Sequence, residues 1–102
     1  MTLIFTVTLV ACGGGDSEPA GDLPHGVTGT AITIGSHNDL SGPLAIWGGP
    51  MINGMRMRFA ELNEAGGVHG RKVEFHVEDA QYQVPLAVKA VNKLINVDEI
   101  VA

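Results

Sequence analysis

The sequence of 102 residues is poor in cysteine, in aromatic side chains and in basic side chains. Its single cysteine, Cys12, excludes a disulfide within the chain. Aromatic residues make up 5% of the chain, and 6 Lys and Arg residues face 11 Asp and Glu residues. Nucleic-acid-binding surfaces combine a basic stripe with interleaved aromatic residues. Because the sequence has no such stripe, nucleic acid is not expected as a partner.

Motifs for metal binding and for catalysis are also missing. His25, His37, His69 and His76 lack the H-x₃-H and H-E-x-x-H spacings by which histidines hold zinc. There is no G-x-S-x-G motif and no Cys/His arrangement for a nucleophile. The glycine-rich residues 66–70 lead from an expected helix into an expected strand, which is the wrong order for a phosphate-binding loop. The sequence therefore predicts no enzyme, no metal and no cofactor.

An apolar run precedes Cys12. It is too short to span a bilayer, which takes about 20 residues, and it is typical of the apolar part of a signal peptide. Residues 9–12, L-V-A-C, match the lipobox of bacterial lipoproteins, in which the cysteine is lipidated. We expect residues 1–12 to be a signal peptide and lipobox, although they lack the usual basic start. The alternative is a buried N-terminal strand with a core cysteine.

The following residues predict a tether and then one folded unit. Residues 13–22, G-G-G-D-S-E-P-A-G-D, are rich in glycine and acid, and we expect a flexible tether over residues 13–30. Export and lipid anchoring at a periplasmic or cell-surface location would follow from this arrangement. With 45% hydrophobic residues, residues 31–102 suffice for at most one domain.

Strand and helix patterns alternate from residue 31 onward. I-T-I at residues 32–34 predicts a strand covered on both faces, and residues 35–42 predict a loop. A helix is expected to begin between residues 45 and 50, because Pro50 fits only the first turn, and to end near residue 65. Its apolar stripe consists of Met51, Ile52, Met55, Phe59 and Leu62.

The second half of the pattern repeats this order. Residues 71–78 alternate between apolar and polar side chains, which predicts a half-exposed strand at the sheet edge. Pro85 opens a second helix, whose Lys89 and Lys93 are expected in solvent, and a third strand is expected to start at residue 100. The apolar face of this helix consists of Ala87, Ala90, Val91, Leu94 and Ile95. The predicted fold class is α/β, a partial doubly wound parallel sheet with β-α-β-α-β topology and strand order 2-1-3.

The loop after the first strand is the candidate ligand site, because open α/β sheets bind ligands at the carboxyl ends of their strands. Trp47 could cover an apolar ligand or pack against its own lobe. Asp39 could recognise a ligand or form an Asx turn or helix cap. Tyr82, in the second loop, has a similar position. The loop residues Ser41, Gly42 and Pro43 could shape the cleft floor or serve only as a turn.

Four segments between residues 32 and 94 together resemble the start of a bacterial substrate-binding protein of the leucine/isoleucine/valine-binding type. They are S-G-P-L-A-I-W-G, F-A-E-L-N-E-A-G-G-V-H-G-R-K-V, V-E-D-A-Q-Y and A-V-K-A-V-N-K-L-I. Such proteins are the solute receptors of ABC importers. The family commonly forms a disulfide from a cysteine soon after the second strand, and residues 79–82, D-A-Q-Y, provide none.

The resemblance implies that residues 31–102 form the N-terminal part of the first lobe of a two-lobed periplasmic binding fold. It implies capture of an amino acid or related small polar solute, delivery to a membrane permease, and contact of Trp47 with the ligand's side chain. An extracellular sensor domain of the same fold, or an enzyme on a doubly wound sheet, are the alternatives. A signalling partner in place of a permease would indicate the sensor domain, and turnover of a substrate by the full-length protein would indicate the enzyme.

Overall fold

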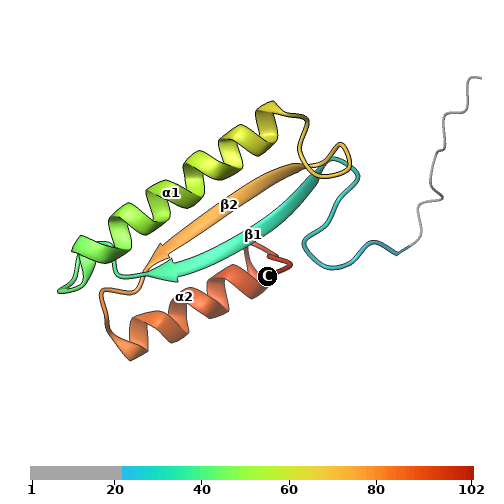
Figure 1. Ribbon diagram of the computed structural model, residues 1–102. Coiled ribbons are helices and arrows are strands. Elements are labelled where there is room, and N and C mark those ends of the chain that lie inside the picture. Colours follow the sequence, from blue (N-terminus) through green and yellow to red (C-terminus); the bar gives the residue numbers. More distant parts are fainter. Residues whose placement is uncertain (1–21) are drawn as a thin grey trace, which may run out of the picture.

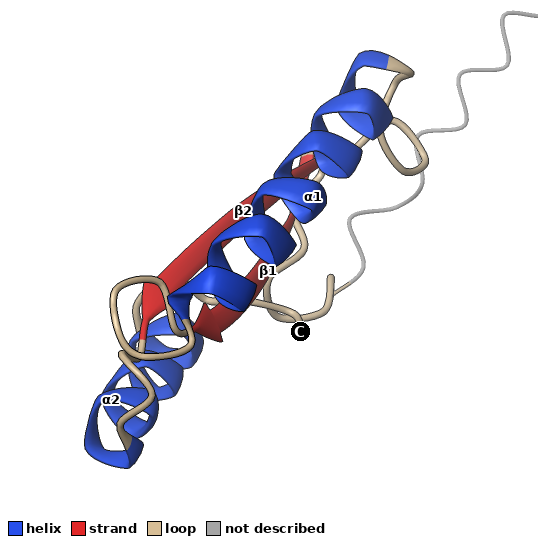
Figure 2. Ribbon diagram, turned by 60° about the vertical axis from the view of Figure 1, so that its left-hand side comes forward, coloured by secondary structure: helices blue, strands red, loops and turns tan. Residues whose placement is uncertain are grey.

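The computed structural model describes residues 22–102, so Cys12 and part of the expected tether lie outside the described residues. The elements follow in the order β1 (Ala31–Asn38), α1 (Ala45–Glu64), β2 (Lys72–Asp79) and α2 (Val84–Asn96). β1 and β2 are parallel, and α1 and α2 cover opposite faces of their sheet (Figure 1, Figure 2). The predicted α/β class is confirmed. No helix within residues 22–102 is long and apolar enough to cross a membrane.

β1 is longer than the sequence predicts. Residues 35–38 were expected in a loop, but their pairing with β2 continues until Asn38 lies opposite Asp79. Gly35 leaves room for the Ile100 side chain, which would have to shift if residue 35 carried a Cβ, because the two would lie 2.8 Å apart. The backbone pairing with an equally long neighbour thus outweighs the low strand propensity of G-S-H-N.

Residues 100–102 lie beside β1 without forming a strand. The N–H of Val101 donates to the Thr33 carbonyl oxygen, and the N–H of Gly35 donates to the Ala102 carbonyl oxygen, each over 2.8 Å. The sheet of the described residues nevertheless has two strands, in the order β1-β2. The expected strand at residue 100 is therefore not formed here, and the order 2-1-3 is not confirmed.

α1 packs its predicted apolar stripe against the sheet, and it differs from the prediction at Met51 and at Pro50. Ile52 is 1% exposed, and the Phe59 ring meets the Phe75 ring of β2 edge to face at a centroid distance of 5.0 Å. Met51, expected beside this stripe, is instead 58% exposed. Pro50 lies beyond the first turn of a helix that begins at Ala45. Proline has no N–H, so the helical hydrogen bond from residue 50 to the Ile46 carbonyl oxygen is missing. Ile46 is 76% exposed, so water can donate to this carbonyl oxygen instead.

The start of α1 lies directly against the backbone of Asp39. Gly48 is buried, and a Cβ at this position would overlap the Asp39 carbonyl oxygen. Gly54, two turns along the same helix, has no neighbouring atom within 4 Å of such a Cβ. A glycine is therefore required at residue 48 by the close approach of helix and loop, whereas residue 54 has room for a side chain.

The side chain of Asn63 completes the pairing of β2. Its amide nitrogen donates to the Val73 carbonyl oxygen over 2.9 Å, and its amide oxygen accepts from the Val73 N–H over 2.8 Å. Val73 is 6% exposed, so water does not readily replace these bonds. Asn63 thereby acts as a short substitute for a neighbouring strand at the edge of the sheet.

α2 covers the other face of the sheet with Ala90 and Leu94, which are 4% and 2% exposed. Val91 and Ile95, expected on the same apolar face, are exposed at 37% and 48%. Lys93 faces solvent as predicted, with 45% of its side chain exposed, and its ammonium group also pairs with two carboxylates. These belong to Glu78 of β2 and to Asp98, and both raise the pKa of Lys93, Glu78 more strongly.

We expect Asn63→Ala to lower the free energy of unfolding by about 1–3 kcal/mol, because it leaves two buried backbone groups of Val73 without partners. Asn92→Ala is the matched control, since the Asn92 amide donates only to the exposed Val88 carbonyl within α2. Denaturant titration of both variants measures the difference. Equal effects of the two substitutions would contradict this role for Asn63.

A second pair of variants tests the contact at the start of α1. Gly48→Ala should destabilise the protein by about 1–3 kcal/mol, because the new methyl group forces the helix away from Asp39. Gly54→Ala should instead stabilise it by about 0.5–1 kcal/mol through lower backbone entropy of the unfolded chain. Thermal unfolding distinguishes the two signs, and a stabilising Gly48→Ala would show that the helix start can move without loss.

Candidate functional site

Two loops leave the sheet at the same end. Residues 39–44 connect β1 to α1, and residues 80–83 connect β2 to α2. Because the strands are parallel and in register, both loops follow carboxyl ends and lie next to each other (Figure 1). This is the position at which open α/β sheets bind their ligands.

A groove of about 670 Å³ opens between these loops and the first turns of the two helices. Most of its surface is apolar, and the predicted site residues Trp47, Asp39 and Tyr82 all line it. The other lining residues are His37, Asn38, Leu44, Gly48, Met51, Ala80, Gln83, Val84 and Ala87. The groove therefore unites three of the residues that the sequence predicts, from both loops.

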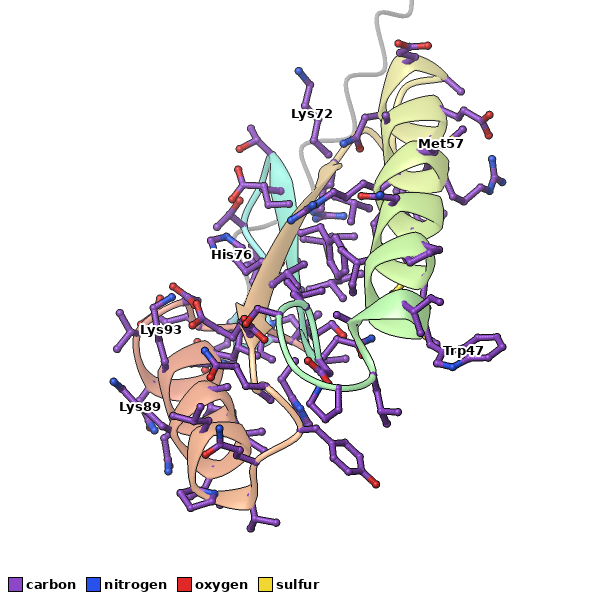
Figure 3. The ribbon with its side chains drawn as sticks, turned by 90° about the vertical axis from the view of Figure 1, so that its left-hand side faces the viewer. Trp47, Met57, Lys72, His76, Lys89 and Lys93 are labelled. Carbon is purple, nitrogen blue, oxygen red and sulfur yellow. The ribbon has the colours of Figure 1, made fainter. Side chains whose placement is uncertain are left out.

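Trp47 and Tyr82 present most of their surface to solvent. Trp47 is 72% exposed and projects from the first turn of α1 away from the sheet (Figure 3), and Tyr82 is 69% exposed. Trp47 thus does not pack into the core of the described residues. Exposed aromatic side chains beside an apolar groove can cover a ligand at low entropic cost. Their contact with a ligand stays a prediction.

The turn that carries Tyr82 is strained. Gln81 and Tyr82 have φ angles of +49° and +55°, a region that side chains other than glycine seldom occupy. Each such residue costs of order 1–3 kcal/mol unless its surroundings hold it. The N–H of Gln83 closes the turn by donating to the Ala80 carbonyl oxygen over 2.8 Å. Strain of this kind is concentrated at functional sites in proteins.

Asp39 is buried, with 6% of its surface exposed, and holds the loop before α1. Its Oδ2 accepts from the N–H of Leu44 over 2.7 Å, and its Oδ1 accepts from the N–H of Gly42. Its negative charge also lies near the start of α1, where the helix dipole favours it. Both carboxylate oxygens therefore serve the backbone as a turn and cap. Contact of Asp39 with a ligand stays a prediction.

Ser41, Gly42 and Pro43 shape the loop, and none of them lines the groove. The Ser41 hydroxyl donates to Oδ2 of Asp79, the last residue of β2. Gly42 lies against the second loop, because a Cβ there would be 2.7 Å from the Gln81 carbonyl oxygen. The structure thus places Ser41 and Gly42 outside the groove lining, in contact with Asp79 and with the second loop, and it leaves Pro43 outside the lining as well.

Asp79 is a site residue that the sequence analysis missed. Its carboxylate accepts from Ser41, which has the largest effect, and from backbone N–H groups including that of Leu40, and together they hold its pKa below the ordinary value of 3.8. Asp79 is therefore ionised near neutral pH and acts only as an acceptor. In the sequence it looks like a polar residue at a strand end, and only the pairing of the strands places it beside the first loop.

Most of the apolar wall was not predicted from the sequence either. Met51 and Ala87 were assigned to helix faces against the sheet, yet both line the groove. Leu44 and Val84 stand beside the expected helix starts, and this position relative to the strand ends is the signal that could have identified them. Within residues 22–102, no three His, Cys, Asp or Glu side chains gather as metal ligands.

Comparison with known protein families identifies a match for this chain. The family described as periplasmic binding protein matches residues 31–102, which include both strands, both helices and the groove. A relative from Rhizobium johnstonii, the Leu/Ile/Val-binding protein BraC3, is 36% identical over 64 residues. The match covers 63% of this chain and 17% of that protein.

Solved structures with the same fold agree with this match. The fatty acid ABC transporter substrate-binding protein from Thermomonospora curvata has a TM-score of 0.71 at 33% identity, over 74% of this chain and 19% of that one. The branched-chain amino acid transporter substrate-binding protein LivJ from Streptococcus pneumoniae, in complex with isoleucine, has a TM-score of 0.67 at 27% identity. That match covers 70% of this chain and 20% of LivJ. This chain belongs to the periplasmic binding protein family.

Proposed function

We propose that this chain forms part of the first lobe of a solute receptor for an ABC importer, which captures an amino acid or related small solute and hands it to a permease. The observation that carries the proposal is the groove at the carboxyl ends of β1 and β2, lined by Trp47 and by apolar side chains. Membership of the periplasmic binding protein family and the names of the relatives support it. The reaction would be binding and release, without bond chemistry.

The character of the groove suggests which part of the solute it contacts. Asp39 is the one acidic residue that lines it, and both of its oxygens accept bonds from the backbone. The groove has no Lys or Arg among its lining residues to pair with a ligand carboxylate. The apolar wall is suited to the aliphatic part of a solute, and the charged ends would be recognised by other parts of the receptor.

Two classes of solute share such an aliphatic part. Branched-chain amino acids are favoured by the Leu/Ile/Val-binding relative and by LivJ. A fatty acid is the second candidate, and the apolar wall together with the relative from Thermomonospora curvata favours it. Titration of the receptor with both lobes present, using L-isoleucine and decanoate, distinguishes the two classes.

The proposed mechanism requires a second lobe. The chain spans 17–20% of the length of the relatives it matches, so we assign to it one wall of the cleft. Closure of the two lobes about a hinge would bury the solute between this wall and an opposing one. The closed form would then be recognised by the permease, which couples capture to transport.

Export and anchoring complete the proposal. We infer that residues 1–12 are a signal peptide and lipobox, that Cys12 is lipidated, and that residues 13–30 connect the lipid to the lobe formed by residues 31–102. The lobe would thereby be kept on the outer side of the membrane near the permease. A single acyl chain binds membranes only marginally, so anchoring requires more than one chain on the modified cysteine.

Trp47→Ala should weaken binding of the favoured solute by at least about 1 kcal/mol, because it removes the largest aromatic surface of the groove. Ile46→Ala is the control, since Ile46 precedes it in the same turn, is 76% exposed and does not line the groove. Calorimetric titration with L-isoleucine and with decanoate gives both affinities. If neither substitution changes the affinity for a solute that binds, Trp47 does not contact the ligand.

Cys12→Ser should release the protein from membranes, because serine cannot form the thioether to which the lipid is attached. Membrane and soluble fractions of cells that express each form are compared by immunoblot. Metabolic labelling with a fatty acid analogue should mark the unaltered protein and leave the variant unmarked. Retention of the variant in the membrane fraction would show that Cys12 is not the anchor.

A further inference from the structure

The carboxylate of Asp79 connects the two loops that form the groove. Asp79 ends β2, and its Oδ1 accepts from the N–H of Leu40 in the first loop and from the N–H of Gln81 in the second, each over 3.0 Å. Its Oδ2 accepts from the hydroxyl of Ser41. One side chain thus makes bonds to both loops, two of them to residues 38 and 39 positions away in the sequence.

The two loops also touch at their backbones. Gly42 lies so close to the Gln81 carbonyl oxygen that a Cβ would be 2.7 Å from it. The first loop continues into the turn of α1 that carries Trp47, whose N–H donates to the Leu44 carbonyl oxygen over 2.9 Å. The second loop carries Tyr82 directly after Gln81. A shift of one loop relative to the other would therefore change the separation of the two aromatic side chains.

We propose that Asp79 is a positioning residue that sets the spacing of Trp47 and Tyr82 across the groove, and through it the width of the apolar group that the groove accepts. Asp79 is not among the residues that line the groove, so it acts through the loops and not by ligand contact. The part of this inference that concerns ligand choice rests on the proposed function. The part that concerns the loops does not.

Charge makes Asp79 suited to this task. A carboxylate has two oxygens with about four acceptor positions, so it can receive all three donors at once, which a hydroxyl cannot. Bonds from N–H and O–H groups to an ionised acceptor are also stronger than neutral ones. The bond to the N–H of Gln81 holds the strained turn in place, and the bonds to Leu40 and Ser41 hold the first loop against it.

The first test needs no ligand. Hydrogen–deuterium exchange of the full chain is compared for the unaltered protein, Asp79→Ala, Asp79→Asn and the control Asp98→Asn, which removes a carboxylate that contacts Lys93 and His76 instead. Asp79→Ala should raise exchange in residues 39–44 and 80–83 by about tenfold or more, as expected for loss of charge-assisted bonds, and leave residues 52–62 unchanged. Asp79→Asn should raise it less, since the amide oxygen can still accept from Leu40 and Gln81.

The outcomes decide the positioning role. Faster exchange in both loops but not in α1 of the Asp79 variants supports the positioning role. Unchanged exchange in the loops of the control Asp98→Asn strengthens this conclusion. If Asp79→Ala raises exchange throughout the chain, Asp79→Asn decides, because it keeps the shape of the side chain. No change in the loops of Asp79→Asn, or an equal rise in α1, would then overturn the inference.

The second test concerns ligand width and uses L-valine, L-leucine and L-phenylalanine as probes for calorimetric titration. A positioning role predicts that Asp79→Asn changes the ratio of the dissociation constants for L-phenylalanine and L-valine by about fivefold or more, whereas Asp98→Asn leaves the ratio unchanged. Equal weakening for every probe indicates a merely structural role and overturns the part on ligand width. If no probe binds the unaltered protein when its second lobe is present, the proposed amino acid ligand is wrong, and the exchange experiment still tests the positioning role of Asp79.

Discussion

The register of the parallel pair β1–β2 is the constraint on which the rest of the structure depends. Asn38 lies opposite Asp79, so the two strands end together, and the N–H of Ala80 donates to the Asn38 carbonyl oxygen to close the ladder. Two loops must then leave the sheet side by side at one edge. A shift of one residue would turn the apolar side chains of one strand to the opposite face and move Asp79 away from the first loop.

The start of α1 shows how that edge is stabilised without an ordinary helix cap. Leu44 precedes the helix and offers no side-chain hydrogen bond. The carboxylate of Asp39 replaces it from five residues away by accepting from the Leu44 N–H, while Gly48 lets the helix lie directly on the Asp39 backbone. The burial of this carboxylate would be unfavourable if it lacked partners. Its two backbone donors, the N–H groups of Gly42 and Leu44, are the reason that an acidic residue can line an apolar groove.

The elements of the fold could be predicted from the sequence because their patterns are local. The apolar stripe of α1, the alternation in β2 and the proline at the start of α2 each depend on the spacing of neighbouring residues. The departures depend on contacts between distant segments. G-S-H-N becomes strand because β2 pairs with it, and the exposed Lys93 forms ion pairs because Glu78 and Asp98 face it. Asp79 could not be identified for the same reason, since its partners lie 38 and 39 residues earlier.

The shape of the groove depends both on a strained turn in the second loop and on the contacts that hold this turn in place. Left-handed Gln81 and Tyr82 make the second loop unfavourable by itself, at of order 1–3 kcal/mol for each residue. The turn persists because strand pairing ends beside it and because the Asp79 carboxylate accepts from the Gln81 N–H. An isolated peptide of these residues would lose both supports and relax. The position of Tyr82 beside the groove is therefore a property of the paired strands and not of the loop sequence, and the aromatic wall can be no more rigid than the ladder that ends beneath it.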